Sequence, residues 1–152
     1  MKVSELMTAP PVSVAPNVSL LEVIQRMTES AIGSVLVVED GTLRGIVTDR
    51  DVVVRGMGNG LSQETRVGAV MSSRVHTVDA SDDLQVAYRA FRRTGVRRLP
   101  VLDEGRVAGV LTIDDLLLDV FRRLADLLGP IAMSVLHEPA GPPAVVGARD
   151  EP

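Results

Sequence analysis

Two short motifs contain the residues of this chain that are best suited to ligand chemistry. Each has a glycine, a threonine three positions later and an aspartate three positions after that: Gly45, Thr48 and Asp51 in the first, and Gly109, Thr112 and Asp115 in the second. The N-terminus of a helix presents free N–H groups that bind phosphate. A threonine hydroxyl there can donate to a phosphate or ribose oxygen, and a carboxylate can accept both hydroxyls of a ribose. The motifs therefore suit a nucleotide.

The same spacing also has a purely structural interpretation. A threonine followed three residues later by an acid is a variant of the capping box, which closes the first turn of a helix. The acid also suits the positive end of the helix dipole. Taken alone, the motifs leave both interpretations open.

Both motifs lie in an internal repeat. A shift of 64 residues aligns the two copies with no gap between Val3 and Val53, and it superimposes Leu20 on Leu84 as well as the two motifs. Each copy predicts, in order, a strand, a helix, two strands and a helix. We therefore expect an α+β fold with two β-α-β-β-α repeats related by pseudo-twofold symmetry.

Turns and short apolar runs place the strands. Residues 12–14 and 75–78 predict a short first strand in each copy. The Asp-Gly pair at 40–41 and the Glu-Gly pair at 104–105 predict tight turns that join the next two strands. Pro100 predicts an edge position or a strand start, because proline cannot donate to a strand ladder.

Apolar residues with helical spacing place the first helix of each copy, beginning at Leu20 in the first. Ser19 or Asn17 could cap that helix, and Ser81 or Asp82 could cap its counterpart. A lone copy of this size would be marginally stable, so we expect the copies to share one core by packing sheet against sheet.

The last helix is predicted from Ile113 to Leu128, and Gly129-Pro130 is expected to stop it. After about His137 the chain becomes rich in Pro, Gly and Ala and has no periodicity, which predicts disorder. The expected organisation is a first repeat at 1–58, a linker at 59–66, a second repeat at 67–129 and a tail at 130–152.

Composition narrows the class of protein. The 152 residues include no cysteine, which excludes disulfides and thiolate chemistry. A net charge of −4 and 2% aromatic residues argue against a nucleic-acid binder. No apolar run is long enough to cross a bilayer and no signal peptide is visible, so we expect a cytoplasmic protein without membrane contact.

Catalytic and metal chemistry find no support in the sequence. No nucleophile elbow, P-loop or pair of catalytic carboxylates is visible, so we predict no catalytic residues and no enzyme activity. His76 and His137 are far apart and match no ligand spacing, so we predict no metal site and no required cofactor.

The duplicated motifs resemble the cystathionine-β-synthase (CBS) domain pair, also called a Bateman module. The resemblance covers about residues 3–128 and rests on VSELM and VGAVM at the heads of the copies, GVRRLPVLD, and GIVTDRD and GVLTIDD at the strand-to-helix turns. The stretch VTDRDVVVRGMGNGLSQET is similar to stand-alone CBS-pair proteins of actinobacteria, including the hypoxic-response type.

The resemblance implies roles for particular residues. In CBS pairs the threonine and aspartate of each motif commonly hold phosphate and ribose, which assigns these roles to Thr48, Asp51, Thr112 and Asp115. It also makes the backbone near Val14 and Val78 a candidate adenine pocket.

Arginines distinguish the two copies. Arg97 and Arg98 precede a strand of the second copy where the first has glycine and serine, and Arg50 corresponds to Asp114. In the family a basic residue before this strand often faces bound phosphates, and a guanidinium suits phosphate. Alternatively, these arginines are solvated or pair with nearby acids.

We therefore expect a non-catalytic regulatory module that binds an adenine nucleotide (AMP, ADP or ATP) between the repeats and signals to an unknown protein. The last helix is apolar over a wide arc from Leu116 to Leu128, which together with the resemblance predicts a homodimer. The alternative is a ligand-free dimeric interaction scaffold with vestigial pockets.

Overall fold

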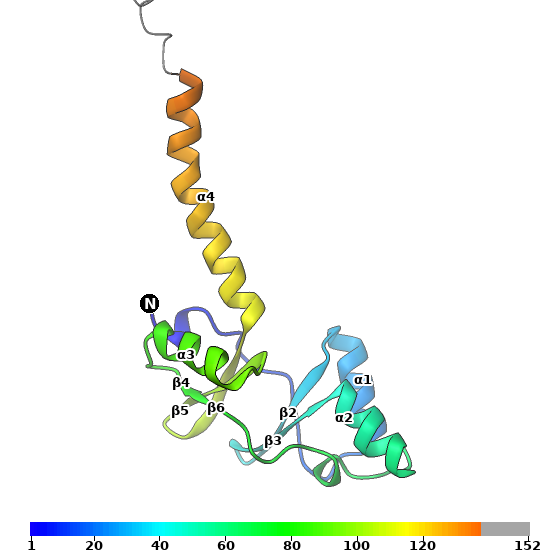
Figure 1. Cartoon of the computed structure of the whole chain (residues 1–152). Coiled ribbons are helices and arrows are strands. Elements are labelled where there is room, and N and C mark those ends of the chain that lie inside the picture. The colour runs from blue at the N-terminus through cyan, green and yellow to red at the C-terminus, as the bar shows by residue number, and fades with distance from the viewer. Residues whose placement is uncertain (138–152) are drawn as a thin grey trace, which may run out of the picture. The chain divides into compact units, whose positions relative to one another are not determined.

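The computed structural model describes residues 1–137; the remaining residues of the predicted tail lie outside the described part. The first repeat contains β1 (Ser13–Val14), α1 (Leu20–Ser30), β2 (Ser34–Glu39), β3 (Thr42–Thr48) and α2 (Asp49–Asp51). The second contains β4 (Val78–Asp79), α3 (Leu84–Thr94), β5 (Arg98–Asp103), β6 (Arg106–Thr112) and α4 (Ile113–His137) (Figure 1). The described residues fall into two units, Met1–Leu116 with both sheets and the part of α4 from Leu117.

Each repeat has a three-stranded mixed sheet in which the long hairpin supplies the central strand and one edge strand. The strand orders are β1-β2-β3 and β4-β5-β6, with the first pair parallel and the second antiparallel. Asp40 and Gly41 have φ of 51° and 79°, and Glu104 and Gly105 have 48° and 77°. Two consecutive left-handed residues are typical of the turn that matches strand twist, so the predicted turns are confirmed.

The hydrophobic residues form two clusters, one for each sheet, rather than the single shared core that we expected. Val3 is fully buried but belongs to the cluster of the second repeat. Val67 and Val70, which begin the second copy in the sequence, are buried in the cluster of the first repeat. Each core therefore takes its head segment from the other copy, and the repeat boundaries in the sequence do not coincide with the packing boundaries.

Backbone hydrogen bonds fix both exchanged segments in the same way. The Thr8 and Val110 N–H groups each donate to the other residue's carbonyl, at 2.9 and 3.0 Å. Ser72 and Ile46 make the equivalent pair at 2.8 and 3.0 Å. The exchange is thus reciprocal and keeps the 64-residue register.

The glycine that begins each motif allows this exchange. A Cβ on Gly45 would lie 2.6 Å from the Ser72 carbonyl oxygen, and one on Gly109 would lie 2.8 Å from the Thr8 carbonyl oxygen. Contacts this short to backbone cannot be relieved by rotating a side chain. The repeated glycine is therefore required for the close approach of a head segment.

Pro100 lies inside β5, the central strand, so the prediction of an edge or strand start is wrong. In the first repeat the N–H of the equivalent Leu36 donates to the Val12 carbonyl at 3.2 Å. In the second repeat β4 begins only at Val78, which pairs with Val101. The missing N–H of Pro100 therefore falls beyond the end of its short parallel neighbour.

Local capping is partly as predicted. Ser19 caps α1, because its Oγ accepts the Glu22 N–H at 3.2 Å. The cap of α3 is Asp83 rather than Ser81 or Asp82. Those two side chains instead bond to Asp79: the Ser81 hydroxyl donates to its carboxylate, and the Asp82 carboxylate accepts its N–H.

The helix α4 continues through Gly129 and Pro130 to His137, so the prediction that this pair ends the helix is wrong (Figure 1). Proline removes one helical hydrogen bond and crowds the preceding residue. Glycine before it has no Cβ, which relieves part of that crowding. Within residues 1–137 no helix is both long and apolar enough to cross a membrane.

Candidate functional site

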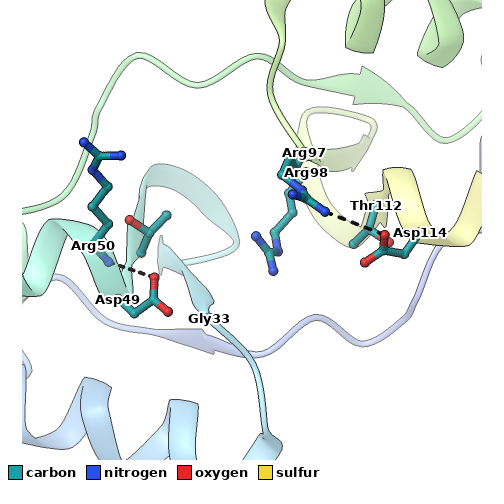
Figure 2. A pocket seen from close by; sticks show the side chains of 8 residues that line it. Gly33, Asp49, Arg50, Arg97, Arg98, Thr112 and Asp114 are labelled. Atoms are coloured by element: carbon teal, nitrogen blue, oxygen red, sulfur yellow. Dashed lines mark hydrogen bonds and ion pairs between the residues drawn. The ribbon is translucent and has the colours of Figure 1, made fainter.

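A cleft of about 380 Å³ brings together strand ends and helix starts from both copies. Five of the predicted site residues line it: Thr48, Arg50, Arg97, Arg98 and Thr112 (Figure 2). Three further lining residues, which the sequence analysis did not select, are Gly33, Asp49 and Asp114.

Strand pairing explains why the threonines meet the residues that differ between the copies. In the β2–β3 hairpin Ser34 is the cross-strand partner of Thr48. In the β5–β6 hairpin the partner of Thr112 is Arg98. The serine-to-arginine difference between the copies thus lies directly opposite a motif threonine, and it makes the cleft chemically asymmetric.

The first motif forms a complete capping box. The Thr48 hydroxyl oxygen accepts the Asp51 N–H at 3.1 Å, and Asp51 Oδ2 accepts the Thr48 N–H at 3.0 Å. Asp51 Oδ1 lies 3.7 Å from the Arg55 Nε. Because the Thr48 hydroxyl oxygen accepts the Asp51 N–H through a lone pair, the hydroxyl can still donate its own proton.

The second motif differs in one bond. Asp115 Oδ2 accepts both the Thr112 N–H, at 2.8 Å, and the Thr112 hydroxyl, at 2.7 Å. The Thr112 hydroxyl oxygen accepts the Asp115 N–H at 3.1 Å. The hydroxyl proton of Thr112 is therefore already engaged, whereas that of Thr48 is available to a ligand.

Asp51 and Asp115 serve first as helix caps, and neither lines the cleft. Their caps use mainly Oδ2. A carboxylate has about four lone-pair directions, so capping leaves acceptor capacity on both residues. The structural and ligand-binding interpretations of the motifs are thus compatible.

The cleft carries three arginines against two aspartates in a chain of net charge −4. Arg97 Nη2 lies 4.0 Å from Asp114 Oδ1, and both side chains are more than 70% exposed. Such an exposed pair contributes about 0–1 kcal/mol and leaves Arg97 easy to redirect. Figure 2 shows Arg98 reaching into the space between the copies, separate from the Arg97–Asp114 pair.

Asp49 and Gly33 form one wall of the cleft. The Asp49 N–H donates to the Gly33 carbonyl at 3.0 Å, and a Cβ on Gly33 would lie 3.1 Å from Asp49 Oδ2. Asp49 Oδ1 accepts the Arg50 N–H at 2.8 Å. Adjacency to the motif threonine was the sequence signal that could have identified Asp49.

Val14 and Val78 do not line this cleft. They are 7% and 6% exposed and belong to the cores of the first and second repeats. Val78 also borders a separate surface groove with Arg89, Arg92 and Arg93 of α3. Any adenine contact from β1 or β4 would therefore involve backbone or neighbouring residues rather than these buried side chains.

Among the described residues, no group of three or more histidine, aspartate or glutamate side chains is placed to hold a metal ion. His76 is exposed on the segment before β4. The side-chain chemistry of the cleft, with arginines and threonine hydroxyls, suits an anionic oxygen ligand rather than a cation.

Comparison with known proteins gives relatives over most of the chain. CBS domain-containing protein YhcV of Bacillus subtilis is 32% identical over 114 residues, covering 75% of this chain and 81% of the relative. Hypoxic response protein 1 of Mycobacterium tuberculosis is also 32% identical over 114 residues, covering 74% and 80%.

Solved structures show the same fold. The crystal structure of Hypoxic Response Protein I with two coordinated zinc ions has a TM-score of 0.71 at 30% identity, covering 76% of this chain and 96% of that one. A CBS domain protein from Pyrobaculum aerophilum complexed with AMP has a TM-score of 0.68 at 25% identity, covering 76% and 90%.

The family model described as the CBS domain matches twice, at residues 3–57 and 67–122. The two matches follow the 64-residue repeat, and each includes one hairpin, one glycine-threonine-aspartate motif and one of the exchanged head segments. The chain therefore belongs to the CBS domain family and is a tandem CBS pair.

Proposed function

We propose that this CBS pair is a regulatory module that binds an adenine nucleotide in the cleft between its repeats. The observation that carries the proposal is the convergence of both motif threonines and three arginines on one cleft of about 380 Å³. The relative complexed with AMP supports an adenosine-containing ligand. The excess of arginine over aspartate supports a ligand with negative charge.

Each group in or beside the cleft has a chemical task. The Arg98 guanidinium and the available Thr48 hydroxyl donate to phosphate oxygens. Arg50, whose side chain makes no recorded ion pair among the described residues, adds a second cation from the first repeat. The uncommitted lone pairs of Asp51 and Asp115 accept ribose hydroxyls after small adjustments of the ligand or the caps.

Regulation then follows from population shift. A nucleotide that touches both repeats favours the arrangement of the repeats in which it binds best. At a hundredfold excess over Kd, binding to one state alone stabilises that state by about 2.7 kcal/mol. This is enough to change the affinity of a partner protein about 100-fold, and it needs no catalytic step.

The test is calorimetric titration and thermal shift with AMP, ADP, ATP, S-adenosylmethionine and NADH. We expect at least one adenine nucleotide to stabilise the protein. Arg98→Ser introduces the residue that the first repeat has at this position. It should weaken the binding of that nucleotide about 10- to 100-fold, since a hydrogen bond to a charged group is worth about 1.5–3 kcal/mol.

Arg89→Ser is the matched control, because it removes the same charge from the exposed face of α3, outside the cleft. Equal weakening by both variants would indicate a general charge effect and contradict the assignment of the cleft. No stabilisation by any of the five ligands at millimolar concentration would instead favour the ligand-free interaction scaffold, in which the motifs act only as helix caps.

A further inference from the structure

The outer face of α3 carries a positive charge that the nucleotide cleft does not use. Arg89, Arg92 and Arg93 are exposed, and they border a groove of about 520 Å³ between α3 and the start of β4. The remaining lining residues are Thr77, Val78, Val86 and Ala90. None of these residues lines the cleft between the repeats. We call this feature the α3 groove.

The three arginines of the α3 groove have no acidic partner. Within residues 1–137 none of their side chains forms an ion pair or a hydrogen bond. The helix α3 contains no aspartate or glutamate, so its three arginines give it a net charge of +3. Like charges three or four positions apart on a helix repel each other. The fold of the second repeat therefore gains little from this cluster.

The helix dipole explains only part of the cluster. Cations stabilise the C-terminal end of a helix, which suits Arg92 and Arg93 in the last turn of α3. Arg89 lies about one turn earlier, in the middle of the helix, where this effect has faded. A role in helix stability therefore leaves at least Arg89 unexplained.

The equivalent helix of the first repeat shows that the fold does not need these arginines. The helix α1 has the same length and no basic residue in its last turn. It contains Glu22, Arg26 and Glu29, so one base and two acids give it a net charge of −1. The charge of α3 is thus a property of one repeat rather than of the shared fold.

The lining of the α3 groove combines this charge with aliphatic surface. Val86 and Ala90 are half-buried beside the exposed arginines. A guanidinium can bind a carboxylate through two parallel hydrogen bonds, and the aliphatic lining suits an apolar side chain. Arg89 and Arg93 are about 6 Å apart along the helix axis. Alternate side chains of an extended chain are about 6.6 Å apart, so the spacing suits acidic residues on an extended polypeptide.

We propose that the α3 groove docks an acidic segment of a partner protein, with carboxylates on the arginines and an aliphatic side chain against the groove lining. No aromatic side chain of the described residues lines the groove, so the bases of a nucleic acid would have nothing to stack on. The α1 face of a second copy fits poorly, because Arg26 lies between its two glutamates and would repel the α3 arginines. The proposal does not rest on nucleotide binding.

The test is fluorescence anisotropy with the full chain and a labelled peptide of about twelve residues, built from repeated Glu-Leu-Glu units. A peptide of Gln-Leu-Gln units is the neutral counterpart. We expect the acidic peptide to bind at least about 10-fold more tightly than the neutral one, and its affinity to fall as salt is added.

The α3 variant combines Arg89→Gln, Arg92→Gln and Arg93→Gln, which keep a high helix propensity. It should weaken binding of the acidic peptide about 10- to 100-fold, because each exposed ion pair changes affinity about 2- to 5-fold. The matched control removes the same charge from exposed arginines elsewhere and should bind like the wild type: Arg26→Gln, Arg66→Gln and Arg106→Gln.

Several results would overturn this proposal: no binding of the acidic peptide at millimolar concentration, equal affinity for both peptides, or equal weakening by the α3 variant and its control. An oligonucleotide that binds more tightly than the acidic peptide, and is lost in the α3 variant, would assign the groove to nucleic acid instead. A change of molar mass in the α3 variant would assign it to a second copy of the chain. Nucleotide titration of the α3 variant separates this proposal from the proposed function, since the cleft contains none of the three arginines and its affinity should be unchanged.

Discussion

The exchange of head segments makes an unusual prediction about which repeat a mutation damages. Val3 belongs to the first copy by sequence but is fully buried in the core of the second. Val3→Ala removes two carbon groups, which costs about 1.6 kcal/mol in transfer free energy. The cavity left behind adds about 24 cal/mol per Å³, so the total destabilisation is about 2–3 kcal/mol.

Hydrogen exchange measured by mass spectrometry can locate this loss. For a change of about 2–3 kcal/mol, amide protection in the affected core falls about 30- to 150-fold. We expect Val3→Ala to lower protection mainly in β5 and β6. Val67→Ala, its 64-residue counterpart, should act mainly on β2 and β3, because Val67 is buried in the core of the first repeat.

Val53→Ala is the control for the substitution itself, since Val53 is 56% exposed. It should change protection little in either sheet. If Val3→Ala loosened β2 and β3 before β5 and β6, each head segment would pack on its own copy and the exchange would be refuted.

Three further predictions concern the motifs and caps. Gly45→Ala should lower the free energy of unfolding in urea by about 1–3 kcal/mol, because its Cβ would lie 2.6 Å from the Ser72 carbonyl oxygen. Gly58→Ala is the control, since its Cβ would meet only an ordinary contact at 3.5 Å. Equal losses of stability in the two variants would contradict the close-approach argument. Asp115→Ala should lower stability by about 1 kcal/mol through loss of the α4 cap, measured by urea unfolding; unchanged stability would show that the cap is dispensable. Hydrogen bonds from the Ser81 hydroxyl and N–H lower the pKa of Asp79 in the folded protein. The ionised Asp79 carboxylate therefore stabilises the fold at pH values above its unfolded pKa, and this stabilisation is lost as the pH falls through its folded pKa. Ser81→Ala should raise the pKa of Asp79 in an NMR titration, and an unchanged pKa would contradict this cause.

Features that depend on neighbours in the chain could be predicted from the sequence. The Thr48 capping box joins residues three apart, and the turn at Gly41 requires a left-handed backbone that glycine favours. The fold order and the family followed from the repeat of such local signals. The cap of α3 was misplaced because three adjacent polar residues compete for it, and only the bonds to Asp79 resolve the competition.

Long-range pairing could not be predicted in the same way. Val3 and Val67 are equivalent under the 64-residue shift, so a head segment fits the core of either copy equally well by sequence. The choice depends on chain path and loop length rather than on residue type. Arg98 could be predicted only in part. Its difference from Ser34 is visible in the sequence, but its position opposite Thr112 depends on the strand register.

The exchange and the asymmetric cleft together suggest how a binding event reaches both repeats. Thr8 is bonded to Val110, two residues before Thr112, and Ser72 is bonded to Ile46, two residues before Thr48. A ligand that shifts either motif threonine therefore pulls on a strand to which the head segment of the other copy is attached. Because only the second copy supplies Arg97 and Arg98, phosphate contacts made by these two arginines would act on β5, and the head exchange would carry the strain to the first repeat. Thr8→Pro removes the N–H that donates to Val110, and it should reduce the nucleotide-dependent gain in β2 and β3 protection while leaving the gain in β5. An undiminished gain in β2 and β3 would show that the hydrogen bond from Thr8 to Val110 does not carry communication between the repeats.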